Sequence, residues 1–181
     1  MAEFQSAFVN LIKNEGGWTN DLDDSGGETF KGIARKYNEL WLGWKIIDGM
    51  KNNNKEKFLA NLRENKKLDG LVEDFYKVNY WNKIRAGEIN NQKIAESIFD
   101  FAVNAGIKTS VSLAQKVIDA SSDGIIGEKS IRKLNSFSES GFINNFALEK
   151  IKRYVSITEK NKKNRKFFFG WIRRTLKDIE I

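Results

Sequence analysis

The sequence predicts a mostly α-helical fold with a short irregular loop or β-hairpin after the first helix. Apolar residues recur at three- and four-residue steps along most of the 181-residue chain, which is the period of an α-helix. Proline, which breaks helices, is absent. Residues 15–33, EGGWTNDLDDSGGETFKGI, hold the tightest glycine cluster and several acids. We expect β-like structure only within residues 18–30.

Helical spacing marks four segments in the first half of the chain: residues 3–14, 33–44, 58–62 and 71–80. Gly16 and Gly17 end the first helix. The polar, glycine-rich residues 18–29 that follow are typical of a turn-rich loop or a short hairpin. A polar loop is expected at 52–54.

The second half has the same pattern in five segments: residues 94–106, 111–118, 129–136, 142–158 and 167–179. A turn, SSDGIIG, and a basic loop, KNKKNRK, separate some of them. The polar joint at 87–92 is the best candidate for a boundary. We therefore expect two halves, 1–90 and 91–181, that share one core.

The amino-acid inventory excludes several kinds of active site. Cysteine and histidine are both absent, which rules out disulfides, thiol nucleophiles, Ser-His-Asp triads and zinc sites built from these residues. General acid–base catalysis would therefore use carboxylates, lysine or tyrosine. We expect neither a metal nor a cofactor.

The net charge of +7 favours an anionic partner such as nucleic acid, anionic lipid or a bacterial envelope. Many basic residues lie late in the chain: Lys150, Lys152, Arg153, Lys160, Lys162, Lys163, Arg165, Lys166, Arg173 and Arg174. They form either a solvated face or a surface that attracts an anionic envelope. No signal peptide and no apolar run of membrane-spanning length is visible. We expect a cytoplasmic protein unless another component releases it.

Glu15 follows the first helix on its apolar side. On a helical wheel at about 100° per residue it lies about 20° from both Phe4 and Phe8. Apolar surroundings would raise the pKa of its carboxyl and let it act as a general acid. The alternative is an ordinary glutamate exposed at a helix end, although the helix dipole makes an acid unfavourable there.

Asp21, Asp23 and Asp24 follow in the glycine-rich loop. They allow three interpretations: turn formation, calcium binding, or a second carboxylate facing Glu15 across a cleft. The spacing D-L-D-D-S-G-G lacks the alternating acids and closing glutamate of an EF-hand loop. Gly26 and Gly27 would let the chain turn tightly beneath a substrate.

Residues 15–33 resemble the motif of glycoside hydrolase family 108, a family of bacterial and phage N-acetylmuramidases that includes endolysins and secretion activator proteins. The family pattern is E-G-G-aromatic-x-N-D-P-x-D-x-G-G-x-T-x-x-G-I, from which only Leu22, in place of proline, departs. YKVNYWNKI (76–84) resembles a further segment of the family. IFDFAVNAG (98–106), DGIIGEKSIRKLN (123–135) and FFFGWIRR (167–174) resemble its C-terminal predicted peptidoglycan domain.

The resemblance implies a lysozyme-like helical fold and cleavage of the β-1,4 bond between N-acetylmuramic acid and N-acetylglucosamine. Phage lysozymes place a catalytic Glu at the end of the first helix, an Asp nine residues later and a Thr a few residues further on. Glu15, Asp24 and Thr29 are similarly placed here, at offsets of nine and then five. Glu15 would then protonate the glycosidic oxygen, Asp24 would be the base or electrostatic partner, and Thr29 would hold the water. Asp21, Asp23 and Glu28 lie close enough to compete.

Sugar binding requires aromatic rings and amides along a cleft. Our candidates are Trp18, Tyr80, Trp81, Asp100 and Asn104. Tyr80 and Trp81 are consecutive, so on one helix they cannot face the same way, and Asn104 could simply cap its helix. Trp41, Trp44 and Trp171 have the spacing of core residues.

The implied partner is bacterial peptidoglycan, reached after holin-type release from the cytoplasm, and a monomer is expected. The alternative function is a non-catalytic wall-binding or secretion-accessory protein. Nucleic-acid binding is disfavoured because no recognition motif is present and 24 acids dilute the charge. The basic, amphipathic tail FFFGWIRRTLKDI could either pack on the core or contact a membrane.

Overall fold

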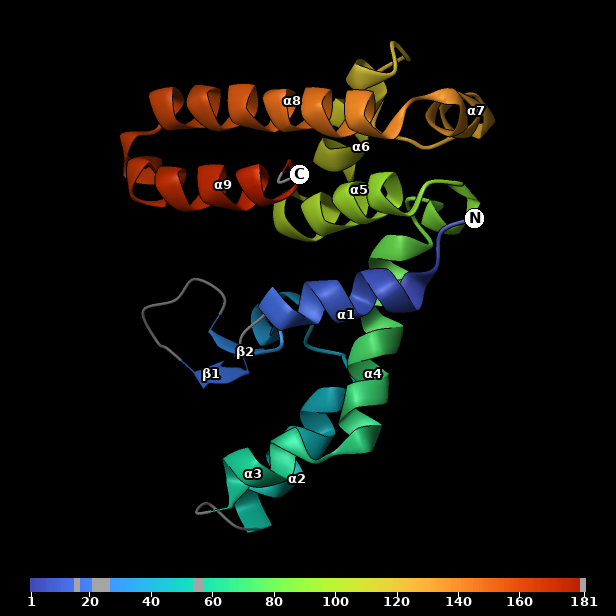
Figure 1. The fold of residues 1–181 in the computed structure, drawn as a ribbon. Helices are drawn as coiled ribbons and strands as arrows, with labels where there is room; N and C mark the ends of the chain where they lie inside the picture. Colours follow the sequence, from blue (N-terminus) through green and yellow to red (C-terminus); the bar gives the residue numbers. More distant parts are fainter. Residues whose placement is uncertain (15–16, 21–26, 54–56, 180–181) are drawn as a thin grey trace. The chain divides into compact units, whose positions relative to one another are not determined.

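The computed structural model describes residues 1–14, 17–20, 27–53 and 57–179 (Figure 1). They form two compact units. The sheet unit is Phe8–Asn79, and the helical unit combines Met1–Ala7 with Tyr80–Ile181. The expected mostly α-helical class, with a hairpin after the first helix, is confirmed. The proposed division into 1–90 and 91–181 stays a prediction.

The sheet unit contains a three-stranded antiparallel sheet in the order β1-β2-β3. Helix α1 is Phe4–Asn14, and the strands are β1 (Trp18–Asn20), β2 (Glu28–Phe30) and β3 (Ile33–Ala34). Trp18 pairs with Phe30 across β1 and β2, and Phe30 pairs with Ile33 across β2 and β3. The hairpin was expected, whereas β3 extends the β structure beyond the predicted residues.

Strand β3 exists because the chain reverses within two residues. Lys31 and Gly32 have φ of 44° and 79°, which is the left-handed pair that a tight two-residue hairpin requires. Asn-Gly or Asp-Gly is the usual sequence signal for such a turn. Lys-Gly does not carry that signal, so the sequence analysis missed this turn.

The predicted helix over 33–44 is wrong. Residues Arg35–Tyr37 form one 3₁₀ turn, and helix α2 begins only at Gly43 and ends at Asn53. The aromatic residues that suggested a helix instead form a cluster around Trp41, whose ring lies 5.1 Å from Trp44 and 6.3 Å from Phe30. A Cβ at Gly43 would lie 2.2 Å from the Trp41 ring, so this close approach requires glycine. Tertiary packing has overridden the local period.

Helices α3 (Phe58–Arg63) and α4 (Lys66–Tyr76) complete the sheet unit, and α4 continues into a π-helical turn, Lys77–Trp81. The Tyr76 hydroxyl, deep in the core, donates to the Lys31 carbonyl at 2.8 Å. This bond ties α4 to the turn between β2 and β3. The unit's core also includes Leu11, Phe30, Ile33, Trp44, Ile47, Leu62, Leu68 and Val72.

The helical unit follows its sequence prediction closely. Its helices are α5 (Gln92–Ala105), α6 (Ile107–Val117), α7 (Glu128–Ser136), α8 (Glu139–Lys160) and α9 (Arg165–Lys177). Gly106, with φ of 87°, permits the sharp turn from α5 to α6. Helices α8 and α9 lie side by side as an antiparallel hairpin joined by a 3₁₀ turn at Lys162–Asn164 (Figure 1).

Candidate active site

The sequence places the candidate acids where α1 ends and where β1 connects to β2. Glu15 comes directly after the last residue of α1, and Asp21, Asp23 and Asp24 belong to the connection between the strands. All four acids lie outside the described residues. Thr29 is described, and it occupies the middle of β2.

Helix α1 has the apolar stripe on which the interpretation of Glu15 depends. Ala7 and Leu11 are buried, as is Phe4 at the start of the helix. Gly17, the next described residue after the helix, accepts a hydrogen bond from the Lys31 backbone at 3.0 Å. Gly17 is therefore held beside the turn between β2 and β3.

The two faces of the sheet separate the candidate residues. Side chains alternate along a strand, and directly paired residues share a face. Trp18 pairs with Phe30 and Asn20 pairs with Glu28, so these four side chains share the face toward α2. Thr29, paired with Thr19, lies on the opposite face. The structure therefore does not bring Trp18 and Thr29 to one surface.

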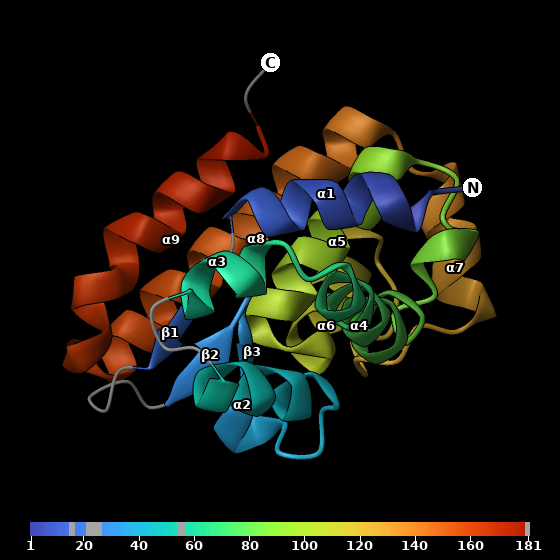
Figure 2. The same ribbon diagram turned by 90° about the horizontal axis from the view of Figure 1, so that it is seen from below.

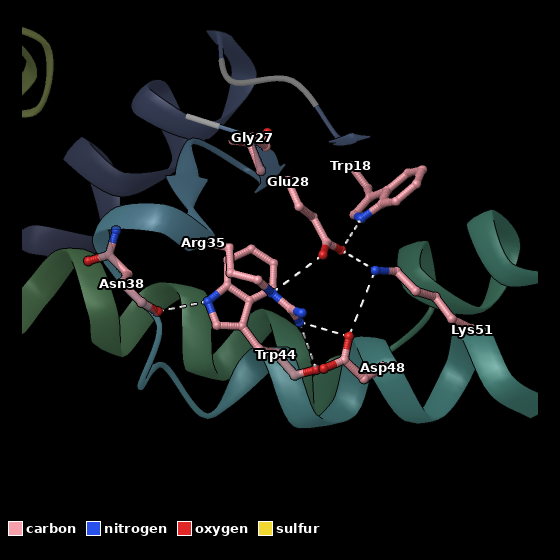
Figure 3. A network of polar contacts seen from close by, with 9 residues as sticks. Trp18, Gly27, Glu28, Arg35, Asn38, Trp44, Asp48 and Lys51 are labelled. Carbon is pink, nitrogen blue, oxygen red and sulfur yellow. Dashed lines mark hydrogen bonds and ion pairs between the residues drawn. The ribbon is translucent and has the colours of Figure 1, made fainter. Parts of the chain in front are cut away.

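Glu28 is the centre of a polar network on the α2 face (Figure 3). Its side chain is only 9% exposed. One carboxylate oxygen accepts from the Trp18 indole at 2.7 Å and from the Lys51 ammonium at 2.5 Å. The other oxygen lies 3.4 Å from Arg35 Nε in an ion pair without hydrogen-bond geometry.

Arg35 extends the same network to α2. Its guanidinium donates to Asp48 at 2.8 Å and stacks 4.6 Å from the centre of the Trp44 ring. The Trp44 indole in turn donates to the Asn38 carbonyl at 2.8 Å (Figure 3). Because both oxygens of Glu28 are engaged in this way, its carboxylate holds the sheet against α2. Thr29, the next residue, faces the opposite side of the sheet.

Thr29 is half-buried, and its hydroxyl donates to the Gly27 carbonyl at 3.3 Å. That bond is long for a hydroxyl donor. A threonine hydroxyl can donate one bond and accept two. It therefore has the capacity to hold a water or a sugar hydroxyl on this face of the sheet.

Trp18 lies beside α2 and α3. Its ring meets the edge of Phe58 at 5.0 Å, and the Lys51 ammonium lies 5.5 Å from its centre. A pocket of about 300 Å³ opens here, lined by Trp18, Asn20, Lys51 and Phe58. A sugar that contacts Trp18 would have to enter this pocket, which lies on the sheet face opposite Thr29.

The other four candidate binding residues belong to the helical unit. Trp81 is 4% exposed and packs its ring edge-on against Phe4 at 5.6 Å and Phe99 at 5.4 Å, whereas Tyr80 is half-buried. The two neighbours thus face different ways, as expected of consecutive residues. The structure places Trp81 in the core.

Asp100 and Asn104 take part in interactions within the helical unit. Asp100 accepts from the Arg174 guanidinium at 2.7 Å, and Asn104 donates to the Asp100 carbonyl at 2.7 Å. The first contact ties α5 to α9, and the second is the helix-end bond considered for Asn104.

Two features were not predicted from the sequence. Glu28, Arg35 and Lys51 come from three elements and have no motif spacing. Lys150 was grouped with the solvated basic residues, yet its side chain is 3% exposed and its ammonium binds Asp178 at 2.7 Å and Ser97 at 3.1 Å. Only its position on the apolar stripe of α8, four residues after Phe146, could have indicated burial. Among the described residues, no group of three or more acids converges as a metal site would require.

Two family models match this chain, and together they indicate a peptidoglycan-related glycosidase family. Residues 8–106 match the Glycosyl hydrolase 108 family, and residues 109–176 match the Predicted Peptidoglycan domain. The chain belongs to the glycosyl hydrolase 108 family. The first match includes Glu15, Asp24 and Thr29, and it also includes 98–106, which the sequence analysis assigned to the second half.

A solved structure shares this fold. The structure of Brucella abortus SagA superposes with a TM-score of 0.61 at 23% identity, over 98% of this chain and 96% of that one. At this identity the likeness concerns the fold alone. The search of curated proteins found no match.

Proposed function

We propose that this glycosidase is an N-acetylmuramidase that cleaves the β-1,4 bond between N-acetylmuramic acid and N-acetylglucosamine. Glu15 acts as the general acid, Asp24 as the base or electrostatic partner, and Thr29 orients the attacking water. Peptidoglycan is the substrate, and no cofactor takes part in the step.

The separation of the two sheet faces is the observation that supports these roles best. Glu28 is the acid nearest to Thr29 in sequence, but both of its oxygens are bound on the α2 face. Thr29 faces the other way. This leaves the acids of the strand connection, Asp21, Asp23 and Asp24, as partners for Glu15. Glycoside hydrolysis needs two carboxyl groups on opposite sides of the scissile bond.

The decisive experiment is the release of soluble fragments from purified peptidoglycan by the full chain. Glu15→Gln keeps the shape of the side chain but removes the acidic proton. It should lower turnover by roughly 10²–10⁴. Reduction of the fragments with borohydride, followed by mass spectrometry, should find muramitol at the new ends. Glucosaminitol at those ends would contradict the proposed bond.

Three matched variants distinguish the second carboxylate. We expect Asp24→Asn to lose activity to a similar degree as Glu15→Gln, and Asp21→Asn and Asp23→Asn to retain most of it. Thr29→Val keeps the strand and the side-chain volume but removes the hydroxyl, so it should lower activity. Thr29→Ser keeps a hydroxyl at that position and should therefore be active. If Glu15→Gln degrades the wall at the wild-type rate, the catalytic assignment is wrong.

Wall binding without cleavage is the second candidate, and the match of residues 109–176 to the Predicted Peptidoglycan domain favours it. Co-sedimentation with peptidoglycan separates the two functions. A wild-type chain that sediments with the wall yet releases no fragments would be a binding protein. An enzyme should release fragments, and its Glu15→Gln variant should still sediment.

A further inference from the structure

The free end of the α8–α9 hairpin is the feature that the proposed function leaves unused. We call this the hairpin tip: Val155–Lys160 of α8, the 3₁₀ turn, and Arg165–Trp171 of α9 (Figure 1). It lies wholly within the helical unit. Neither the Glu28 network nor any candidate catalytic residue belongs to it.

The positive charge of the whole molecule is concentrated at this end of the hairpin and along α9. Residues 160–177 contain eight basic residues and no acid, out of 31 basic and 24 acidic residues in the chain. The rest of the chain therefore has 23 basic and 24 acidic residues, which leaves it close to neutral. The charge of +7 is thus a local property.

Most of this charge is directed to solvent. Arg174 is the exception, since it pairs with Asp100. Five basic side chains around the tip are exposed and form no ion pair with any described residue: Lys160, Lys162, Lys163, Arg165 and Lys166. The positive charges of these side chains repel one another. Their electrostatic free energy therefore falls when an anionic surface approaches.

Large apolar side chains are exposed among these cations. Phe169 is 71% exposed, and Phe167 and Leu176 are each about half exposed. Phe169 and Leu176 are seven residues apart, so they lie on one side of α9, away from the buried Thr175. An apolar groove of about 340 Å³ adjoins Phe169 and runs between α8 and α9, lined also by Val155, Thr158, Glu159, Arg165 and Phe168.

We propose that the hairpin tip docks onto the surface of an anionic phospholipid bilayer. Phe169 and the groove edge enter the interface between head groups and acyl chains, and the surrounding lysines and arginines bind the phosphates. Aromatic residues beside Lys and Arg are the composition of interfacial membrane attachment. Among the described residues, no helix qualifies as a membrane span.

The charge and the exposed rings together select this occupant. A second copy of the chain would bring two strongly basic surfaces together. A soluble polyanion, whether nucleic acid or an acidic wall polymer, would satisfy the cations but would offer no hydrocarbon phase for Phe169. A bilayer with anionic head groups satisfies both, because it pairs negative charge with an apolar interior.

The test is co-sedimentation of the full chain with vesicles of phosphatidylglycerol and phosphatidylcholine in equal parts, and with pure phosphatidylcholine vesicles. The Glu15→Gln variant is used throughout, so the result does not depend on hydrolysis. Binding should require phosphatidylglycerol and should weaken as salt is added. Equal binding to both vesicles, or no binding at low salt, would overturn the proposal.

Two variants with matched controls examine the contacts. Lys162→Gln with Lys163→Gln should lower the partition coefficient roughly 30-fold, because each basic residue near an anionic surface contributes about fivefold. Phe169→Ser should lower it about tenfold through lost apolar burial. Two controls lie away from the tip. Lys83→Gln with Lys116→Gln removes the same charge as the lysine variant, and Ile125→Ser replaces an exposed apolar side chain, as Phe169→Ser does. Both controls should bind as the parent does.

Soluble polyphosphate separates the bilayer from other anions. If binding follows the lysines but is unchanged by Phe169→Ser, and polyphosphate competes for it completely, the tip is a site for soluble polyanions and the bilayer proposal fails. Peptidoglycan degradation by the same tip variants in the wild-type Glu15 background should be unchanged. Membrane docking and catalysis can therefore fail separately.

Discussion

At the scale of single residues, Glu28 and Thr29 show how two neighbours on one strand acquire different tasks. Alternation along β2 directs Glu28 to α2 and Thr29 to the other face. The glutamate is then surrounded by two cations and an indole, and it becomes part of the support of the site. If the register of β1 and β2 had been known, strand alternation alone would have assigned Trp18 and Thr29 to opposite faces of the sheet.

The support by Glu28 can be measured. Glu28→Gln keeps the side-chain shape and an oxygen for the Trp18 indole, but it leaves Lys51 and Arg35 without their carboxylate. Because Glu28 is nearly buried while its partners are about a third exposed, we expect a loss of about 1–2 kcal/mol in the free energy of unfolding. Urea denaturation followed by circular dichroism measures it.

Asp48→Asn is the matched control for Glu28→Gln. Asp48 also binds Arg35, but its side chain is 47% exposed, and exposed ion pairs contribute about 0–1 kcal/mol. Its replacement should therefore cost clearly less than that of Glu28. Equal losses for the two variants would mean that Glu28 is an ordinary surface partner.

At the scale of elements, helices were predictable where the apolar period is local, whereas two elements of the sheet unit were not. Helices α5 to α9 lie within a few residues of their expected ranges, because each buries one stripe against its neighbours. Strand β3 and helix α2 were missed. The turn before β3 is local, but its Lys-Gly pair lacks the usual hairpin signal. For α2 the cause is non-local, because Trp41 packs on Phe30, and a linear pattern does not contain this contact.

The loop between α6 and α7 offers an element-scale prediction at Gly124. This residue has φ of 79°, and a Cβ there would lie 2.6 Å from the Lys108 side chain and 3.0 Å from the Lys108 carbonyl. Both the backbone strain and the contact oppose a side chain. Gly124→Ala should therefore reduce the free energy of unfolding by about 1–3 kcal/mol.

Gly170→Ala in the same unit should have the opposite effect. Gly170 lies inside α9 on its exposed side, and a Cβ would meet nothing within 4 Å. Alanine favours a helix interior over glycine by about 0.5–1 kcal/mol, so this variant should be more stable than the wild type. The urea midpoints of the two variants should move in opposite directions, and an unchanged or raised midpoint for Gly124→Ala would refute the steric argument there.

At the scale of the whole molecule, charge is divided unevenly between the two units. The sheet unit, Phe8–Asn79, has 12 basic and 12 acidic residues, and the helical unit has the remaining 19 basic and 12 acidic ones. The late position of the basic residues is visible in the sequence. The sequence does not separate exposed lysines from Lys150 and Arg174, which form internal ion pairs. That distinction depends on which face of each helix is buried.

Several carboxylates of the helical unit also make its stability depend on pH. Hydrogen bonds from Arg85 lower the pKa of Glu88, those from Gln115 and the Ile125 backbone lower that of Asp123, and those from Asn91 and Lys93 lower that of Glu139. A carboxylate whose pKa is lower in the folded chain binds fewer protons there than in the unfolded chain. Its stabilisation is present above the unfolded pKa and is lost as the pH falls through the folded value.

We therefore expect the urea midpoint to stay level between pH 7 and about pH 5, because carboxyl groups have ordinary pKa values of about 4, and to fall steadily below that. Asp123→Asn removes one contributor, so its midpoint should be lower than the wild type at pH 7 and should approach it near pH 3. Glu3→Gln, at an exposed acid in the same unit, should follow the wild-type curve. If the Asp123→Asn difference stayed constant across this range, the bonds from Gln115 and Ile125 would act through shape alone, and the charge of Asp123 would not contribute to folding.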